Sequence, residues 1–105
     1  MSYDWQALGT RIAQSDRLII IPHQHPDGDA MGSATALFGY LQSINKDVTL
    51  FCATAAHQKW RFMEHADRVT SDPAVFTTAI DTIIVLDSGD LRYAGVEQYV
   101  KNHTA

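Results

Sequence analysis

The sequence predicts one α/β domain built on an open, mostly parallel sheet flanked by helices. Two Ile-rich runs, Arg17 to Pro22 and Thr82 to Leu86, are apolar on both faces, as strands buried in a parallel sheet are. A helical pattern from about Ala30 to Ser43 or Ile44 lies between the first run and a second apolar run, Val48 to Cys52. A strand, a helix and a strand within about 35 residues form a βαβ unit, which is almost always right-handed with parallel strands. The expected architecture is Rossmann-like.

The remaining elements follow from local patterns, taken in chain order. Asp4 to Gln14 carries Trp5, Leu8 and Ile12 at helical spacing, with Asp4 as the expected N-cap, and Asp29 is expected to cap the helix that begins near Ala30. Further along, we expect a short helix at 57–64, a small strand at 68–70, a turn or helical turn at 73–79 and a final helix at 91–101.

Composition limits the class of protein. With 105 residues the chain fits one domain, and 46% hydrophobic and 19% charged residues are typical of a soluble globular protein. The net charge is −4 and the eight basic residues form no stripe, which argues against a duplex nucleic-acid partner. Cys52 is the single cysteine and the N-terminus has no signal-peptide pattern. No apolar run approaches the roughly 20 residues of a membrane span, so we expect a cytoplasmic protein without a membrane partner.

Metal-ligand side chains follow two of the predicted strands directly. His23, His25, Asp27 and Asp29 come after the first Ile-rich run, and Asp87 comes after Thr82 to Leu86. Ligands of open α/β sheets bind outside the carboxyl ends of the strands, so these side chains are expected at one edge. Converging carboxylates need a cation, and oxygen ligands with one or two imidazoles suit Mn²⁺ or Mg²⁺. Two such ions serve phosphoryl chemistry, with Asp87 as the candidate bridging ligand.

The amino-acid sequences of these two turns are similar to two motifs of a known family. His23-x-x-Pro26-Asp27-Gly28-Asp29-Ala30-x-Gly32-Ser33 resembles the first motif of the DHH phosphoesterases, and Asp87-Ser88-Gly89-Asp90-x-Arg92 resembles their second. Within that family it is most similar to the oligoribonuclease and phosphoadenosine-phosphate phosphatase (nano-RNase) branch. The resemblance implies that His23 and Asp27 bind one Mn²⁺ ion, that Asp29 binds a second, and that Asp87 bridges both.

Two parts of the family pattern are missing from the chain. The third motif, Asp-His-His, does not occur, and Asn102-His103 does not replace it. The C-terminal substrate-binding domain of the family is also absent. We therefore expect residues 1–105 to be the N-terminal part of a DHH phosphoesterase domain, a poor catalyst by itself. An apolar sheet edge that is meant to be covered would make a homodimer possible.

Each of these side chains also has a purely structural interpretation. An aspartate before a helix can be a cap, but capping needs one carboxylate and explains neither His23 nor Asp27. His25 is equally compatible with a substrate contact and with an exposed turn, and Arg92 with a phosphate contact or an ordinary surface position. The other residues considered are expected to be structural or exposed: His57, His65 and His103 at the surface or in structural contacts, Asp81 and Asp90 in turns, Trp60, Phe62 and Met63 in the core, and Cys52 as a buried thiol.

The function implied by the resemblance is Mn²⁺-dependent hydrolysis of short oligoribonucleotides or of a nucleoside 3′,5′-bisphosphate by water that two metal ions activate. Catalysis and metal binding would fall to His23, Asp27, Asp29 and Asp87. Three alternatives stay open: a cyclic-dinucleotide hydrolase, a pyrophosphate or polyphosphate hydrolase of the same superfamily, and a non-catalytic metal- or nucleotide-binding domain. A dinucleotide-binding Rossmann domain is discounted because the first turn lacks Gly-x-Gly-x-x-Gly spacing.

Overall fold

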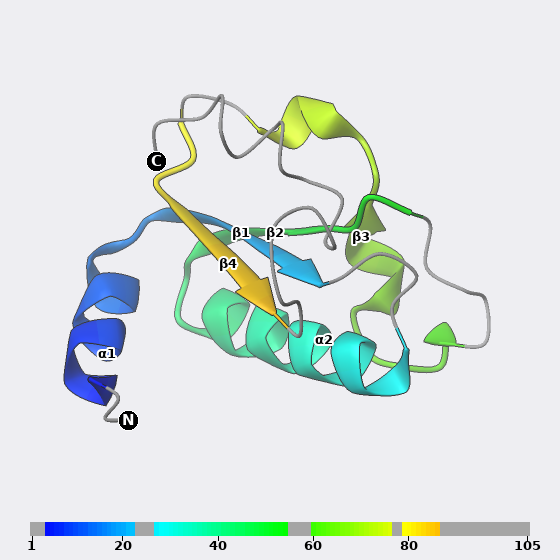
Figure 1. Cartoon of the computed structure of the whole chain (residues 1–105), viewed down its shortest axis with the longest axis horizontal. Helices are drawn as coiled ribbons and strands as arrows, with labels where there is room; N and C mark the ends of the chain where they lie inside the picture. Colours follow the sequence, from blue (N-terminus) through cyan, green and yellow to red (C-terminus); the bar gives the residue numbers. More distant parts are fainter. Residues whose placement is uncertain (1–3, 23–26, 55–59, 77–78, 87–105) are drawn as a thin grey trace.

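The computed structural model describes residues 4–22, 27–54, 60–76 and 79–86, and these form a parallel sheet with helices on it (Figure 1). The predicted α/β class is confirmed. The sheet has the strand order β3-β2-β1-β4, and every neighbouring pair is parallel. The strands and helices are α1 (Trp5–Gln14), β1 (Arg17–Pro22), α2 (Gly28–Ser43), β2 (Asp47–Phe51), β3 (Val69–Thr70) and β4 (Thr82–Leu86), with short 3-10 helices η2 (Ala66–Arg68) and η3 (Pro73–Val75).

Strand β1 lies in the interior of the sheet, between β2 and β4. Its five residues after Arg17 are all buried, as the continuous apolar run predicts for a strand covered on both faces. Leu18 and Ile20 pack with Phe38 and Leu41 of α2 on one face. On the other face Ile19 and Ile21 pack with Phe51, and Val75 and Phe76 from the segment around η3 lie against this cluster.

Helix α1 forms where it was predicted, with Asp4 as its N-cap. The Asp4 side chain accepts a hydrogen bond from the Ala7 backbone N–H at 2.8 Å. Ile12 packs against the core, whereas Trp5 and Leu8 are 70% and 49% exposed. The helical spacing was therefore correctly predicted, but only the carboxyl-terminal part of α1 reaches the sheet.

The described part of the helix predicted at 57–64, residues 60–64, does not form an α-helix, and residues 57–59 lie outside the described residues. Residues 60–64 form a single 3-10 position followed by turns and a bend, and they continue through turns into η2. His65 stands at φ 69°, a left-handed conformation that no α-helix can include. The small strand at 68–70 and the helical turn within 73–79 are confirmed as β3 and η3, while the predicted helix at 91–101 lies outside the described residues.

In the part of the chain that the structure describes, no helix is both long and apolar enough to cross a membrane.

Candidate metal site at the carboxyl edge of the sheet

The two motifs start from neighbouring strand ends. Pro22, the last residue of β1, is the register partner of Leu86, the last residue of β4. His23 and Asp87 are the next residues of the chain after this pair. The chain also reverses its direction of travel here: β1 leads outward through α2 to β2 and β3, and then returns to place β4 on the other side of β1. Such a switch point is where open α/β sheets form their ligand crevice.

Asp27 is the N-cap of α2, and this corrects the prediction that Asp29 caps the helix. The Ala30 backbone N–H donates to Asp27 Oδ1 at 2.9 Å, and the Met31 N–H donates to the Asp27 carbonyl at 2.9 Å. Helix α2 begins at Gly28, two residues earlier than expected. The reason is that Gly28 and Asp29 adopt helical conformation, so the only cap position left is the aspartate before them.

Asp29 lies in the first turn of α2 and is exposed, as Asp27 is. Both carboxylates stand at the positive end of the dipole of a 16-residue helix, which favours negative charge at this position. The two carboxylates therefore sit, accessible to solvent, where the chain leaves the carboxyl end of β1.

The donor set that is described fits a hard divalent cation. Carboxylate oxygens are the ligands that Mg²⁺ and Mn²⁺ prefer. Among residues 4–22, 27–54, 60–76 and 79–86, no three His, Cys, Asp or Glu side chains come together as a metal site. Asp27 and Asp29 are thus the described part of the predicted set, while His23, His25, Asp87 and Arg92 lie outside the described residues.

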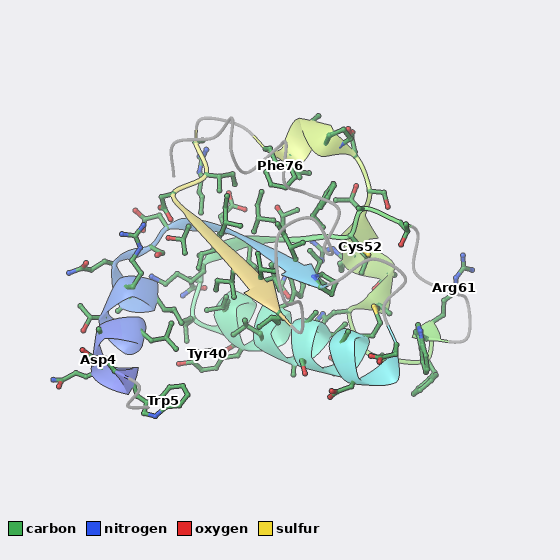
Figure 2. All side chains as sticks on the ribbon, in the orientation of Figure 1. Asp4, Trp5, Tyr40, Cys52, Arg61 and Phe76 are labelled. Atoms are coloured by element: carbon green, nitrogen blue, oxygen red, sulfur yellow. The ribbon has the colours of Figure 1, made fainter. Side chains whose placement is uncertain are left out.

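Trp60, which was predicted to lie in the core, is half-buried and contacts the same turn. A Cβ atom built on Gly28 would lie 3.2 Å from Cη2 and 3.3 Å from Cζ3 of Trp60. The indole edge therefore rests on the backbone between Asp27 and Asp29. Figure 2 agrees: the chain around the labelled Arg61 lies beside the first turn of α2. Only the small residue at position 28 hinted at a close approach, and nothing in the sequence identified its partner.

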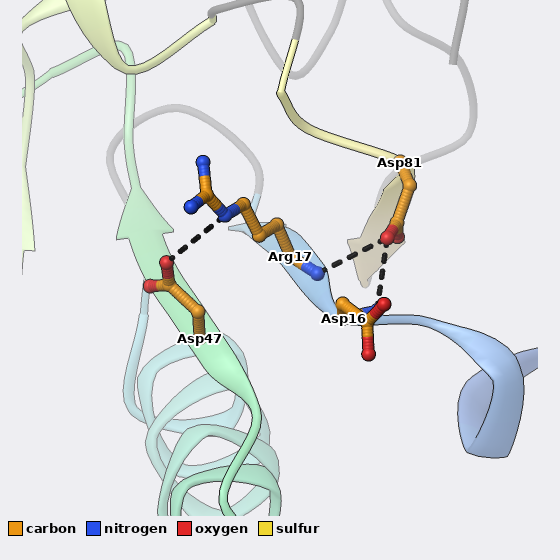
Figure 3. Close-up of polar contacts among 4 residues, drawn as sticks. All are labelled: Asp16, Arg17, Asp47 and Asp81. Atoms are coloured by element: carbon orange, nitrogen blue, oxygen red, sulfur yellow. Dashed lines mark hydrogen bonds and ion pairs between the residues drawn. The ribbon is translucent and has the colours of Figure 1, made fainter.

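Asp81 has a structural position at the amino edge of the sheet (Figure 3). Asp81 Oδ2 accepts hydrogen bonds from the backbone N–H groups of Asp16 (2.9 Å) and Arg17 (3.2 Å). Burial raises the pKa of Asp81, but these donors and the Arg11 guanidinium outweigh it, and the pKa lies below its ordinary value of 3.8. Asp81 joins the starts of β1 and β4, in agreement with the turn role predicted for it.

The other residues considered divide between structural and exposed positions. His65 packs on Phe38, with ring centroids 5.2 Å apart, which confirms a structural contact. Cys52 is buried, as predicted. Phe62 is 78% exposed, so its assignment to the core was wrong; the turns at 60–64 leave it without the helical face that would have turned it inward. His57, Asp90 and His103 lie outside the described residues.

The parallel order β3-β2-β1-β4 with helices packed on it places the chain in the class of open α/β domains. The family is shown by its sequence model: residues 17–105 match the DHH family, N-terminal domain, and the chain belongs to this family. Among solved structures, it is similar to an exopolyphosphatase-related protein from Bacteroides fragilis at 22% identity and a TM-score of 0.82. The match covers 90% of this chain and 30% of that protein, so the chain spans about a third of its relative. None of the curated proteins gives a significant match.

Proposed function

We propose that this chain forms the metal-binding half of a phosphoesterase site, with Mn²⁺ as its ion and Mg²⁺ as the alternative. The observation that carries the proposal is the register pair Pro22 and Leu86, from which both DHH motifs continue. In this proposal His23 and Asp27 hold one ion, Asp29 holds the second and Asp87 bridges them. When bound, two such ions would activate water and neutralise the charge of the phosphoryl oxygens.

The chain's own residues have distinct roles in this proposal. Asp27 fixes its side-chain direction through the bond from the Ala30 N–H, which holds one carboxylate at the sheet edge. Asp29 contributes a second carboxylate from the exposed side of the first turn. The positive end of the α2 dipole also favours an incoming phosphate. His25 and Arg92 are proposed to contact the substrate.

The proposed substrates are short oligoribonucleotides or a nucleoside 3′,5′-bisphosphate. A single-stranded or mononucleotide substrate agrees with the net charge of −4 and the scarcity of basic residues, since duplex binding relies on many phosphate contacts. A second candidate is hydrolysis of pyrophosphate or polyphosphate, because the structural relative is an exopolyphosphatase-related protein.

The test is hydrolysis by the native-length protein of an RNA dinucleotide, of adenosine 3′,5′-bisphosphate and of polyphosphate, with Mn²⁺ and with a chelator. Asp87→Asn removes the proposed bridging ligand and should abolish turnover. Asp67→Asn is the matched control, because it makes the same change of charge at an exposed residue of η2. Cleavage of polyphosphate alone would favour the second candidate. A folded protein that binds Mn²⁺ and cleaves none of the three would leave a non-catalytic binding domain.

A further inference from the structure

The contact between Trp60 and Gly28 places an aromatic ring on the turn that carries the two carboxylates. Cη2 and Cζ3 of the indole would stand 3.2 and 3.3 Å from a Cβ at position 28. This is closer than an ordinary van der Waals contact, so the ring occupies the space that any larger residue would need. Gly28 therefore lies between the two aspartates in the sequence and is also the residue against which the Trp60 indole packs.

The chain that carries Trp60 is attached to α2 at a second place. A Cβ at Gly39 would lie 3.0 Å from His65 Nε2, and Arg68 stands 5.6 Å over the Phe38 ring that His65 also contacts. Positions 28 and 39 are eleven residues apart, which is about three turns and returns to the same helix face some 16 Å away. Residues 60–68 therefore run along one face of α2 and contact it at both ends.

The first turn of a helix is the part that most needs such support. Its N–H groups lack partners within the helix, and helix ends fray. Asp27 supplies one partner through the Ala30 N–H, but Asp29 is exposed and its direction depends on the orientation of the turn itself. Metal ligands need their positions held to within about 0.5 Å, which requires neighbouring groups that fix them.

We propose that Trp60 is a positioning residue of the metal site: its indole holds the backbone of Gly28, and thereby the carboxylates of Asp27 and Asp29, in the orientation that binds the ions. The inference rests on the proposed function.

The test is a double-mutant cycle on Mn²⁺ affinity, measured by the electron paramagnetic resonance signal of free Mn²⁺, with Trp60→Leu, Gly28→Ala and the double variant. Trp60→Leu should weaken Mn²⁺ binding about 10-fold, the scale for groups that orient metal ligands. Gly28→Ala should weaken Mn²⁺ binding several-fold when Trp60 is present and should leave Mn²⁺ binding unchanged in the Trp60→Leu background. A general loss of stability would not produce this dependence of one substitution on the other.

A fluorescence measurement adds a second readout. The chain has two tryptophans, and Trp5 is 70% exposed on α1. In Trp5→Phe the emission of Trp60 alone should be quenched by paramagnetic Mn²⁺ at the concentrations at which it binds, but not by Mg²⁺. Trp5→Phe is also the matched control for affinity and should bind Mn²⁺ as the unchanged protein does.

The outcomes separate the two proposals. If the unchanged protein binds no Mn²⁺, the proposed function fails and the positioning role fails with it. If it binds Mn²⁺ and the two substitutions act independently, the positioning role alone is overturned. Should Trp60→Leu fail to fold, Trp60→Phe replaces it: the smaller ring reaches less far, so Gly28→Ala should cost less affinity there, and an equal cost would overturn the role.

Discussion

Asp27 has a cap role in the structure and a ligand role in the proposal, and two substitutions separate them. Asp27→Ala removes the acceptor of the Ala30 N–H, a 2.9 Å hydrogen bond. Loss of an N-cap costs about 1 kcal/mol, which for a domain of this size lowers Tm by about 4 °C. Asp27→Asn keeps a side-chain oxygen in the same place, and asparagine is as good a cap as aspartate. Its Tm should stay within about 2 °C of the unchanged protein.

Metal binding, unlike stability, should not distinguish the two variants. Both remove the anionic carboxylate, so both should lose Mn²⁺ affinity to a similar extent. A ligand at 100 times its Kd stabilises the folded state by about 2.7 kcal/mol, so the unchanged protein should gain roughly 10 °C in Tm with saturating Mn²⁺. Neither variant should show this gain at the same concentration.

The assays are thermal unfolding followed by circular dichroism, with a chelator and with Mn²⁺, and calorimetric titration of the ion. Asp67→Asn, an exposed residue of η2, controls for the loss of one negative charge. Full Mn²⁺ affinity in Asp27→Asn would refute the ligand role and leave Asp27 as a cap. Equal stability of Asp27→Ala and Asp27→Asn in the chelator would refute the cap energy worked out above.

Two further predictions concern the scaffold. Asp81→Ala should lower the free energy of unfolding by about 1 kcal/mol at pH 7, because two backbone donors lose a partly solvated carboxylate. Since the folded pKa of Asp81 is lowered, this stability is present above pH 3.8 and lost as the pH falls through the folded pKa; urea unfolding that shows an unchanged difference at low pH would contradict it. Gly39→Ala should lower Tm when His65 is present, because the new Cβ would lie 3.0 Å from His65 Nε2. In the His65→Ala background the same substitution should raise Tm, because only the gain of about 1 kcal/mol in helix propensity remains. Equal shifts in both backgrounds would exclude the clash.

The strands were predictable because a buried parallel strand has a local signature. β1 has the predicted bounds Arg17–Pro22, and β4 the predicted bounds Thr82–Leu86. Both are runs of branched apolar residues between polar turns, and burial on both faces needs no alternation. Their pairing could also be expected, because a right-handed βαβ unit and a return to the other side of β1 leave few topologies.

Residues 60–68 were less predictable because their structure depends on contacts with α2. The left-handed His65 and the turns around it are compatible with the packing of its ring on Phe38 and Gly39, which no pattern within the segment announces. For the same reason, the exposure of Phe62 and the contact between Trp60 and Gly28 could not be predicted from the sequence. These are distant contacts between a turn and a helix face, and sequence periodicity carries information only about residues on the same element.

From the sequence alone, capping and metal binding are alternative roles for the aspartates of the first motif. In the structure Asp27 is the N-cap of α2, and the two roles are compatible. An ionised carboxylate has two oxygens and about four acceptor positions, and the bond from Ala30 uses one of them at Oδ1. That bond limits the rotation of the Asp27 side chain, so the cap supplies part of the order that a metal ligand needs before the ion arrives. Capping therefore supports the ligand role of Asp27 rather than competing with it. Asp29 does not cap the helix, so the orientation of its carboxylate depends more on the packing of Trp60 against Gly28.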